Sequence, residues 1–496
     1  MSTVQFHELT IENYHEALLA GGLTTADLVK WYIDRINRHN SAGAGLGAVV
    51  TVSPFAHDDA TRLDEELART GALAGPLHGV PVLVKDQAET AGLRTTFGSE
   101  IFSDYIPAED ATVITKLRDA GAIILAKTSM CDFAAGWFSS SSVTGRTKNP
   151  YDLTRDSGGS SAGSGAGLSA NFGLVAVGED TGGSIRIPAS FTNVFGLRVT
   201  TGLISRSGFS PLVHFQDTPG PMGRTVDDLA RLLDALVGYD PSDSFTVATL
   251  SAPTVGTYAR AVATTPEIGT WSVGVLETGF GDSGNVDAVN VTAVVRAAID
   301  TLHHHGVNMT PNLTIDQLGR WIAETSLYVK QSKIDISAFL ASRKDSPASS
   351  FMEIYTSGRF HPLNDLFNNI AAGPDGLEGD PEYMQLRLNQ QDFSRLVLTL
   401  FAENDVDFLV YPTVQVIPPT QGELEEGKYT ALTFPTNTVI GSQAGLPALT
   451  IPVGFTPDGL PVGMELLGKP FAEAQMLQFA RAWEITAGSR TAPDLD

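Results

Sequence analysis

A glycine- and serine-rich segment from Ser157 to Pro188 constrains this chain more than any other feature. Residues 158–165 read GGSSAGSG, residues 174–177 form the apolar run LVAV, and residues 178–186 read GEDTGGSIR. A flexible linker would not be interrupted by a core strand and an Asp–Arg pair. Close packing of backbones, which glycine permits, is compatible with chemistry at the same place. The segment therefore predicts tight loops at the end of a buried strand.

Short apolar runs alternate with amphipathic stretches along most of the chain. This alternation predicts an α/β fold whose sheet is buried on both faces. Helices are expected after the N-cap candidates Thr24 and Thr25 and at about 110–120, and strands at 80–84, 122–126, 174–177, 408–410, 448–453 and 462–467. No linker or repeat divides the 496 residues, so we expect one large domain over 1–496, with a more helical variable region at about 300–400.

Composition narrows the function classes. With 32 Lys and Arg against 56 Asp and Glu, the net charge is −24, which argues against a nucleic-acid or anionic-membrane surface. The single cysteine excludes a cysteine-based zinc site, and nothing suggests a metal or an organic cofactor. The N-terminus lacks the pattern of a secretory signal, and no apolar run is long enough to span a membrane. We expect a soluble, cytoplasmic protein.

Two common catalytic motifs do not fit the glycine-rich segment. A phosphate-binding loop needs a lysine after its glycines, and the next basic residue here is Arg186. Residues 159–163 match G-x-S-x-G around Ser161, but a loop-like stretch precedes them, and no histidine lies beyond His361 to complete a triad.

A lysine can replace the histidine as the base that activates a serine. Lys85 follows the apolar run 80–84, where desolvation would lower its pKa toward neutrality. A lone lysine at a strand end is more often part of a structural ion pair with a buried carboxylate. The serine clusters at 157–164 and Ser184 make the catalytic interpretation competitive.

Taken together, the motifs resemble the amidase signature family. They cover most of the chain in order, and only about 240–400 carries little of the resemblance: GPLHGVP at 75–81 with Lys85-Asp86, AKTSM at 126–130, KNPY at 148–151, GGSS at 158–161, DTGGSIRIP at 180–188, GLR at 196–198, DTPGPM at 217–222 and AGLPA at 444–448. The resemblance implies a mixed, mostly parallel central sheet covered by helices on both faces.

The resemblance also implies a Ser-cisSer-Lys triad. Lys85 matches the lysine, Ser160 the bridging serine with a cis peptide, and Ser184 the nucleophile. Backbone amides around Thr181, Gly182, Gly183 and Ser184 would form the oxyanion hole, and the backbone carbonyl of Ala134 would lie near the substrate. Ser161, Asp180 and Arg186 would support the loops.

The implied activity is hydrolysis of C–N bonds in small or aryl acyl amides through an acyl-enzyme on Ser184, with carbamates and esters as further substrates. The alternative is the amidase subunit of a tRNA-dependent amidotransferase, which would need a partner subunit. The acidic charge favours a small-molecule substrate, with neither nucleic acid nor membrane as a partner. The sequence leaves the oligomeric state open. Glu179 departs from the family pattern, in which a threonine or similar residue is common.

Overall fold

The computed structural model describes residues 5–252, 256–488 and 490–495. Within them, eleven strands form one sheet in the order β1-β3-β2-β6-β8-β7-β12-β13-β11-β9-β10. These strands are β1 Val49–Val52, β2 Pro81–Lys85, β3 Ile123–Thr128, β6 Val175–Glu179, β7 Phe195–Arg198, β8 Pro219–Gly223, β9 Ser272–Leu276, β10 Asn308–Leu313, β11 Phe408–Pro412, β12 Ala448–Phe455 and β13 Pro461–Leu467. A separate hairpin pairs β4 Lys148–Asn149 with β5 Asp152–Asp156.

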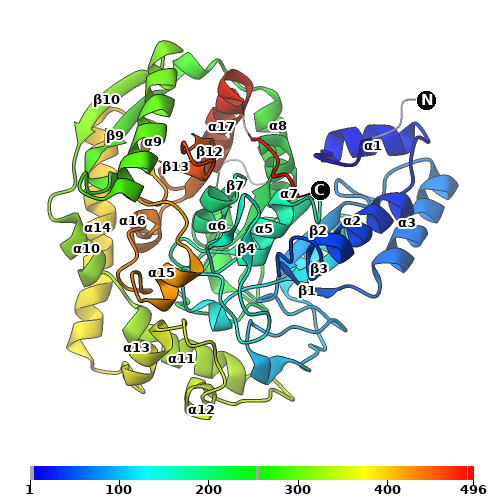
Figure 1. Ribbon diagram of the computed structural model, residues 1–496, viewed down its shortest axis with the longest axis horizontal. Coiled ribbons are helices and arrows are strands. Elements are labelled where there is room, and N and C mark those ends of the chain that lie inside the picture. The colour runs from blue at the N-terminus through cyan, green and yellow to red at the C-terminus, as the bar shows by residue number, and fades with distance from the viewer. Residues whose placement is uncertain (1–4, 253–255, 489, 496) are drawn as a thin grey trace.

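Helices surround this sheet (Figure 1). The α-helices are α1 Ile11–Leu19, α2 Thr25–His39, α3 Ala56–Thr70, α4 Thr112–Asp119, α5 Ala162–Ser169, α6 Arg186–Phe191, α7 Val226–Leu236, α8 Tyr258–Ala263, α9 Val286–His304, α10 Leu318–Glu324, α11 Tyr328–Ala341, α12 Phe351–Ser357, α13 Leu366–Ala372, α14 Pro381–Asn404, α15 Gln421–Glu425, α16 Thr438–Ala444 and α17 Glu473–Ala487. Short 3-10 helices are η1 Glu100–Phe102, η2 Asp132–Ala134, η3 Ser244–Leu250, η4 Ile268–Thr270 and η5 Glu277–Gly279.

The sheet is mixed, and its continuity makes the chain a single α/β domain, as expected. Parallel pairing occurs in two blocks, β3–β2–β6 and β11–β9–β10. The strands between these blocks pair antiparallel, as does the edge strand β1 with β3. Parallel pairing is therefore concentrated where crossover helices join neighbouring strands, rather than running through the whole sheet.

Helices cover both faces of the sheet, as predicted. Along β11, Phe408 and Val410 belong to the largest apolar cluster, whereas Leu409 and Tyr411 belong to a different one. Because successive strand residues point to opposite faces, these two clusters lie on opposite sides of the sheet. Helices α9 and α17 contribute to the first cluster, and α14 and α16 contribute to the second.

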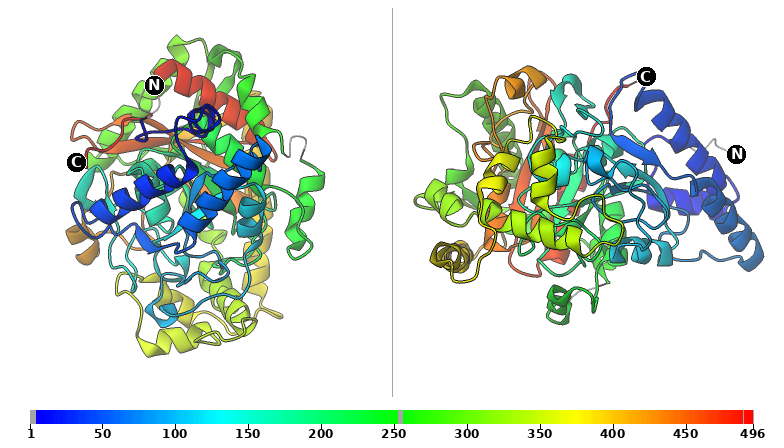
Figure 2. Two further views of the ribbon diagram at one scale, coloured as in Figure 1. Left: turned by 90° about the vertical axis from the view of Figure 1, so that its right-hand side faces the viewer. Right: turned by 90° about the horizontal axis from the view of Figure 1, so that it is seen from below.

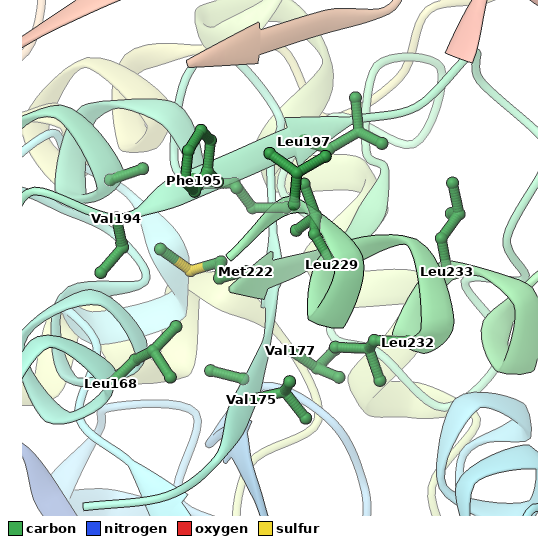
Figure 3. Packing of buried hydrophobic residues seen from close by; sticks show 14 of the residues in the cluster. Leu168, Val175, Val177, Val194, Phe195, Leu197, Met222, Leu229, Leu232 and Leu233 are labelled. Atoms are coloured by element: carbon green, nitrogen blue, oxygen red, sulfur yellow. The ribbon is translucent and has the colours of Figure 1, made fainter. Parts of the chain in front are cut away.

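The predicted early elements are confirmed with small shifts of their ends. Helix α2 begins after the N-cap Thr24, whose side chain accepts from the Asp27 amide in a capping box. The apolar runs at 80–84 and 174–177 become β2 and β6, neighbours in parallel register with Val84 opposite Val177. Figure 3 shows the α7 side chains beside Met222 of β8 and Val177 of β6. Parallel pairing brings the carboxyl ends of β2 and β6 together.

The expected helical region at about 300–400 contains α10 to α13 and most of α14, together with β10. Helices α11, α12 and α13 lie together at the lower edge of Figure 1 and face the viewer in the right-hand view of Figure 2. They share an apolar cluster with Phe97, Phe133 and Trp137 from the first third of the chain. Across the described ranges, no helix combines the length and apolar character needed to cross a bilayer.

Candidate active site

Lys85, the last residue of β2, is fully buried at the carboxyl end of the sheet. Its Nζ donates to Ser160 Oγ at 2.8 Å and to the Glu179 carbonyl oxygen at 3.2 Å. The Glu179 carboxylate Oε2 lies 3.4 Å from the same nitrogen. Burial lowers the pKa of the Lys85 ammonium, and the Glu179 carboxylate opposes that shift. Lys85 therefore has the contacts of both interpretations, because it contacts a serine, as a catalytic base would, and a buried acid, as a structural ion pair would.

Ser160 and Ser161 lie at the start of the fully buried helix α5. The peptide bond between Gly159 and Ser160 is cis. Ser161 does not contact Lys85: its Oγ donates to the Glu179 carbonyl at 3.2 Å and lies 3.3 Å from the Glu179 amide nitrogen, which donates to it. Its own amide donates to the Ser184 carbonyl at 3.0 Å. Ser161 therefore ties the serine loop to β6 and to the loop that carries Ser184.

Ser184 lies on the loop between β6 and α6, with 1% of its surface exposed. In the described part of the chain, no hydrogen bond engages its Oγ, so Ser184 and Ser160 are not hydrogen-bonded to each other. The amides of Thr181, Gly182 and Ser184 are likewise without an acceptor among the described residues. The Gly183 amide is engaged, because it donates to Asp180 Oδ1 at 2.7 Å. Of the four amides expected to form the oxyanion hole, three therefore have no acceptor among the described residues, and the fourth is engaged by Asp180.

The carboxylate of Asp180 accepts hydrogen bonds from this loop and from the arginines beside it. Its carboxylate accepts from the amides of Gly183 and Ile185 and from Arg186 Nε and Nη2, at 2.7 to 3.1 Å. Arg198 Nη1 lies 3.3 Å from Asp180 Oδ1. Burial alone would raise the pKa of Asp180, but the two guanidinium groups outweigh it and lower the pKa to about 2. Asp180 and Arg186 therefore form a buried ion pair that also holds the amides of Gly183 and Ile185.

We expect Asp180→Asn to destabilise the protein by about 3–5 kcal/mol, because it removes the carboxylate that pairs with Arg198 and one of the two carboxylates that pair with Arg186. Urea unfolding would measure the change. Ser442→Ala is the matched control: it removes the 3.1 Å contact from Arg186 Nη2 and the 2.8 Å hydrogen bond that Ser442 Oγ donates to the Thr438 carbonyl, and it should cost about 1–2 kcal/mol. Equal unfolding midpoints for the two variants would contradict the bracing role of Asp180.

A cavity of about 720 Å³ lies beside the loop. Trp137, Tyr328 and Phe434 line it. A Cβ on Gly182 would lie 1.9 Å from the Tyr328 hydroxyl and 2.5 Å from Trp137 Cη2, so only glycine fits against this wall. Thr438 Oγ1 donates to the Gly182 carbonyl at 2.7 Å. Trp137 and Tyr328 therefore lie between the cavity and the loop that presents the unengaged amides, and the residues that line the cavity include none from that loop.

Several site residues differ from what the sequence could indicate. Ala134 is buried in η2 with a left-handed φ of 58°, and its carbonyl accepts from the Gly136 amide at 3.0 Å. Tyr328 carried no motif, and nothing in the sequence pointed to it. Asp217 lies in the DTPGPM motif and accepts from Thr181 Oγ1 at 2.6 Å, a contact the motif alone does not reveal.

Comparisons with known proteins agree on the family. The family model described as Amidase matches residues 27–477. A glutamyl-tRNA(Gln) amidotransferase subunit from Moorella thermoacetica is 34% identical, with 99% of each chain covered. The native peptide amidase from Stenotrophomonas maltophilia matches at a TM-score of 0.87 and 30% identity, with 99% of each chain covered. The corresponding glutamyl-tRNA(Gln) amidotransferase subunit from Thermotoga maritima matches at a TM-score of 0.77 and 26% identity, also over 99% of each chain.

These relatives correct the prediction about partners. The acidic charge led us to expect a small-molecule substrate and no nucleic acid. Relatives that match this chain over nearly their whole length are named as subunits of an enzyme that acts on a glutamyl-tRNA. The exclusion was wrong because net charge averages over the whole surface and says nothing of a local patch or of a partner subunit.

The family match spans the glycine-rich loops, Lys85 and the late strands alike. A sequence relative and a solved structure each match 99% of the chain. The chain belongs to the amidase family and is a hydrolase that acts on C–N amide bonds.

Proposed function

We propose that the protein hydrolyses amides through an acyl-enzyme on Ser184, with Lys85 and Ser160 as a proton relay. The observation that carries this proposal is the 2.8 Å hydrogen bond between Lys85 Nζ and Ser160 Oγ, in a site without solvent exposure at either residue. A buried lysine loses its proton more readily than an exposed one, so it can act as a base near neutral pH.

In the proposed reaction, neutral Lys85 draws a proton through Ser160 from Ser184 as Ser184 Oγ attacks the carbonyl carbon. The amides of Thr181, Gly182 and Ser184 stabilise the oxyanion that develops. The relay then returns the proton to the leaving nitrogen, which leaves poorly as an anion. Water, activated by the same relay, releases the acyl group. The open contact between Ser184 and Ser160 would close with substrate bound, as catalytic hydrogen bonds often do.

Two substrate classes fit this chemistry. The amidotransferase relatives favour the side-chain amide of glutamine, with ammonia passed to a partner subunit; their identities to this chain of 32–34% support this reading. The second candidate is a free-standing amidase for peptide amides. It is supported by the higher TM-score to the peptide amidase, 0.87 against 0.77, and by the mainly apolar cavity. The charged residues on that cavity, Lys330 and Glu382, pair with each other at 2.7 Å.

One panel separates these candidates. The purified protein is offered L-glutamine and one acyl group as a peptide primary amide, an anilide, an ester and a carbamate, with Ser184→Ala as control. Ammonia from the primary amide without any partner would favour the free-standing amidase. Turnover of glutamine only after a co-purifying subunit is added would favour the amidotransferase subunit. No turnover and no covalent labelling of Ser184 under either condition would contradict the proposal.

A further inference from the structure

The carboxyl group of Glu179 lies next to the lysine on which the proposed relay depends. Glu179 ends β6, and its side chain is fully buried, as is that of Lys85 at the end of the neighbouring strand β2. Glu179 Oε2 lies 3.4 Å from Lys85 Nζ, and the same nitrogen donates to Ser160 Oγ. Charges are poorly screened in a buried site, so the charge of this acid changes the pH at which the lysine loses its proton.

The remaining oxygen of Glu179 indicates how the acid is held. Oε1 lies 3.2 Å from Thr181 Oγ1, which lies 2.6 Å from Asp217 Oδ1. A threonine hydroxyl has one proton, and the shorter contact to Asp217 takes it. The contact to Glu179 is then satisfied when Glu179 carries a proton and donates it to Thr181 Oγ1. The surroundings can therefore hold Glu179 in its protonated form as well as paired with a lysine ammonium.

Charged and titratable groups reach the pair from every element around it. They are Asp180 on the loop after β6, Asp217 before β8, Arg198 on β7, Cys131 before η2 and Tyr328 on α11. Burial raises the pKa of Glu179 to about 7, with Asp217 and Asp180 adding to the rise and Lys85 opposing it. Arg198 is held by Asp180, so its charge is compensated outside the pair.

We propose that Glu179 sets the pH at which Lys85 becomes a base, by holding the lysine proton in a buried pair. In the resting pair, Lys85 is an ammonium and Glu179 a carboxylate. When the proton is instead held by the carboxyl group on Oε1, where Thr181 Oγ1 accepts it, the pair consists of a neutral amine and a neutral carboxylic acid, and its net charge is unchanged. The same carboxylate stabilises the ammonium, so Lys85 stays protonated to a higher pH than burial alone would allow. Glu179 is thus a positioning residue for the proposed reaction, on which this inference rests.

The test is the rate at which a fluorophosphonate labels Ser184 between about pH 5 and about pH 10, in the full-length protein and in Glu179→Gln. The amide keeps the shape of the side chain and removes its charge. The midpoint of the acidic limb should move down by about one pH unit. One unit below the wild-type midpoint, the variant should then label about five-fold faster relative to its own plateau. Glu179→Thr carries the same expectation, should the glutamine variant fail to fold.

Asp228→Asn is the matched control. Asp228 is also a buried carboxyl group whose pKa burial raises to about 6, but it accepts from the Ile11 amide on α1. Its midpoint should equal that of the wild type. A midpoint in the Glu179 variants that stays in place or moves up would overturn the inference. Absence of Ser184 labelling in the wild type at every pH would instead overturn the proposed function.

Discussion

Ser184→Ala should abolish turnover and covalent labelling, with a loss of at least about a thousand-fold in kcat. Two hydroxyl groups lie on the loop that presents the unengaged amides: Thr181 Oγ1 donates to Asp217 Oδ1, whereas Ser184 Oγ makes no hydrogen bond within the described residues. A carbonyl bound against those amides would lie within reach of its Oγ. The protein should remain folded, because in the described part of the chain the Ser184 hydroxyl makes no hydrogen bond that the substitution would remove. Thermal unfolding alongside the labelling assay would measure both effects.

Ser161→Ala is the matched control, because it tests whether the other buried serine is the nucleophile. Ser161 is as buried as Ser184 and is the centre of the G-x-S-x-G match, yet its hydroxyl is taken up by the backbone of Glu179. We expect this variant to lose about 1 kcal/mol of stability and to keep Ser184 labelling. If Ser161→Ala alone abolished labelling while Ser184→Ala retained it, the nucleophile would be Ser161.

The sequence could predict the position of Lys85 because the signal is local. The apolar run at 80–84 indicates a buried strand, and the run at 174–177 indicates another. Since parallel neighbours share a carboxyl edge, Lys85 and the residues that follow Val177 meet there. The family resemblance places Ser160 at the same edge. This part of the site therefore follows from strand patterns and motif spacing.

Helix α5 could not be predicted in the same way. Its sequence, AGSGAGLS, contains three glycines, each of which disfavours a helix by about 1 kcal/mol. Tertiary packing overrides that preference: a Cβ on Gly163 would lie 2.0 Å from the Ala48 carbonyl oxygen. The small residues allow the helix to lie against its neighbours, and only the assembled fold reveals that requirement.

The buried ion network beneath the loop was also beyond the sequence. Arg186 was expected to support the loop, but its Nη1 also donates to Glu465 Oε1 at 2.7 Å, a contact between residues 279 positions apart. Arg198 appeared in the sequence only as the last residue of the GLR motif at 196–198. Contacts of this kind depend on how distant strands are ordered in the sheet, and the sequence did not determine the order of β7, β12 and β13.

Two buried lysines lie on adjacent strands, and only their contacts distinguish them. Lys85 on β2 holds Ser160, whereas Lys127 on β3 pairs with Asp86 at 3.3 Å and donates to the Ala88 carbonyl and to Thr95 Oγ1. Both side chains are fully buried. The first contact set provides a path for a proton, and the second satisfies an ammonium without any reactive group. Replacing Lys85 should therefore reduce activity more than stability, whereas replacing Lys127 should reduce stability more than activity.

Lys85→Met should reduce kcat and Ser184 labelling by at least about a thousand-fold at neutral pH, because it removes the proton acceptor of the relay. The methionine keeps most of the buried volume, and Glu179 can neutralise by protonation, so unfolding should change by less than about 2 kcal/mol. Lys127→Met should instead cost about 3 kcal/mol or more, since Asp86 loses its counter-charge, and the folded fraction should still label. Urea unfolding and active-site labelling on both variants measure the four quantities. Near-normal labelling in Lys85→Met would remove Lys85 from the mechanism and leave it a structural partner of Glu179.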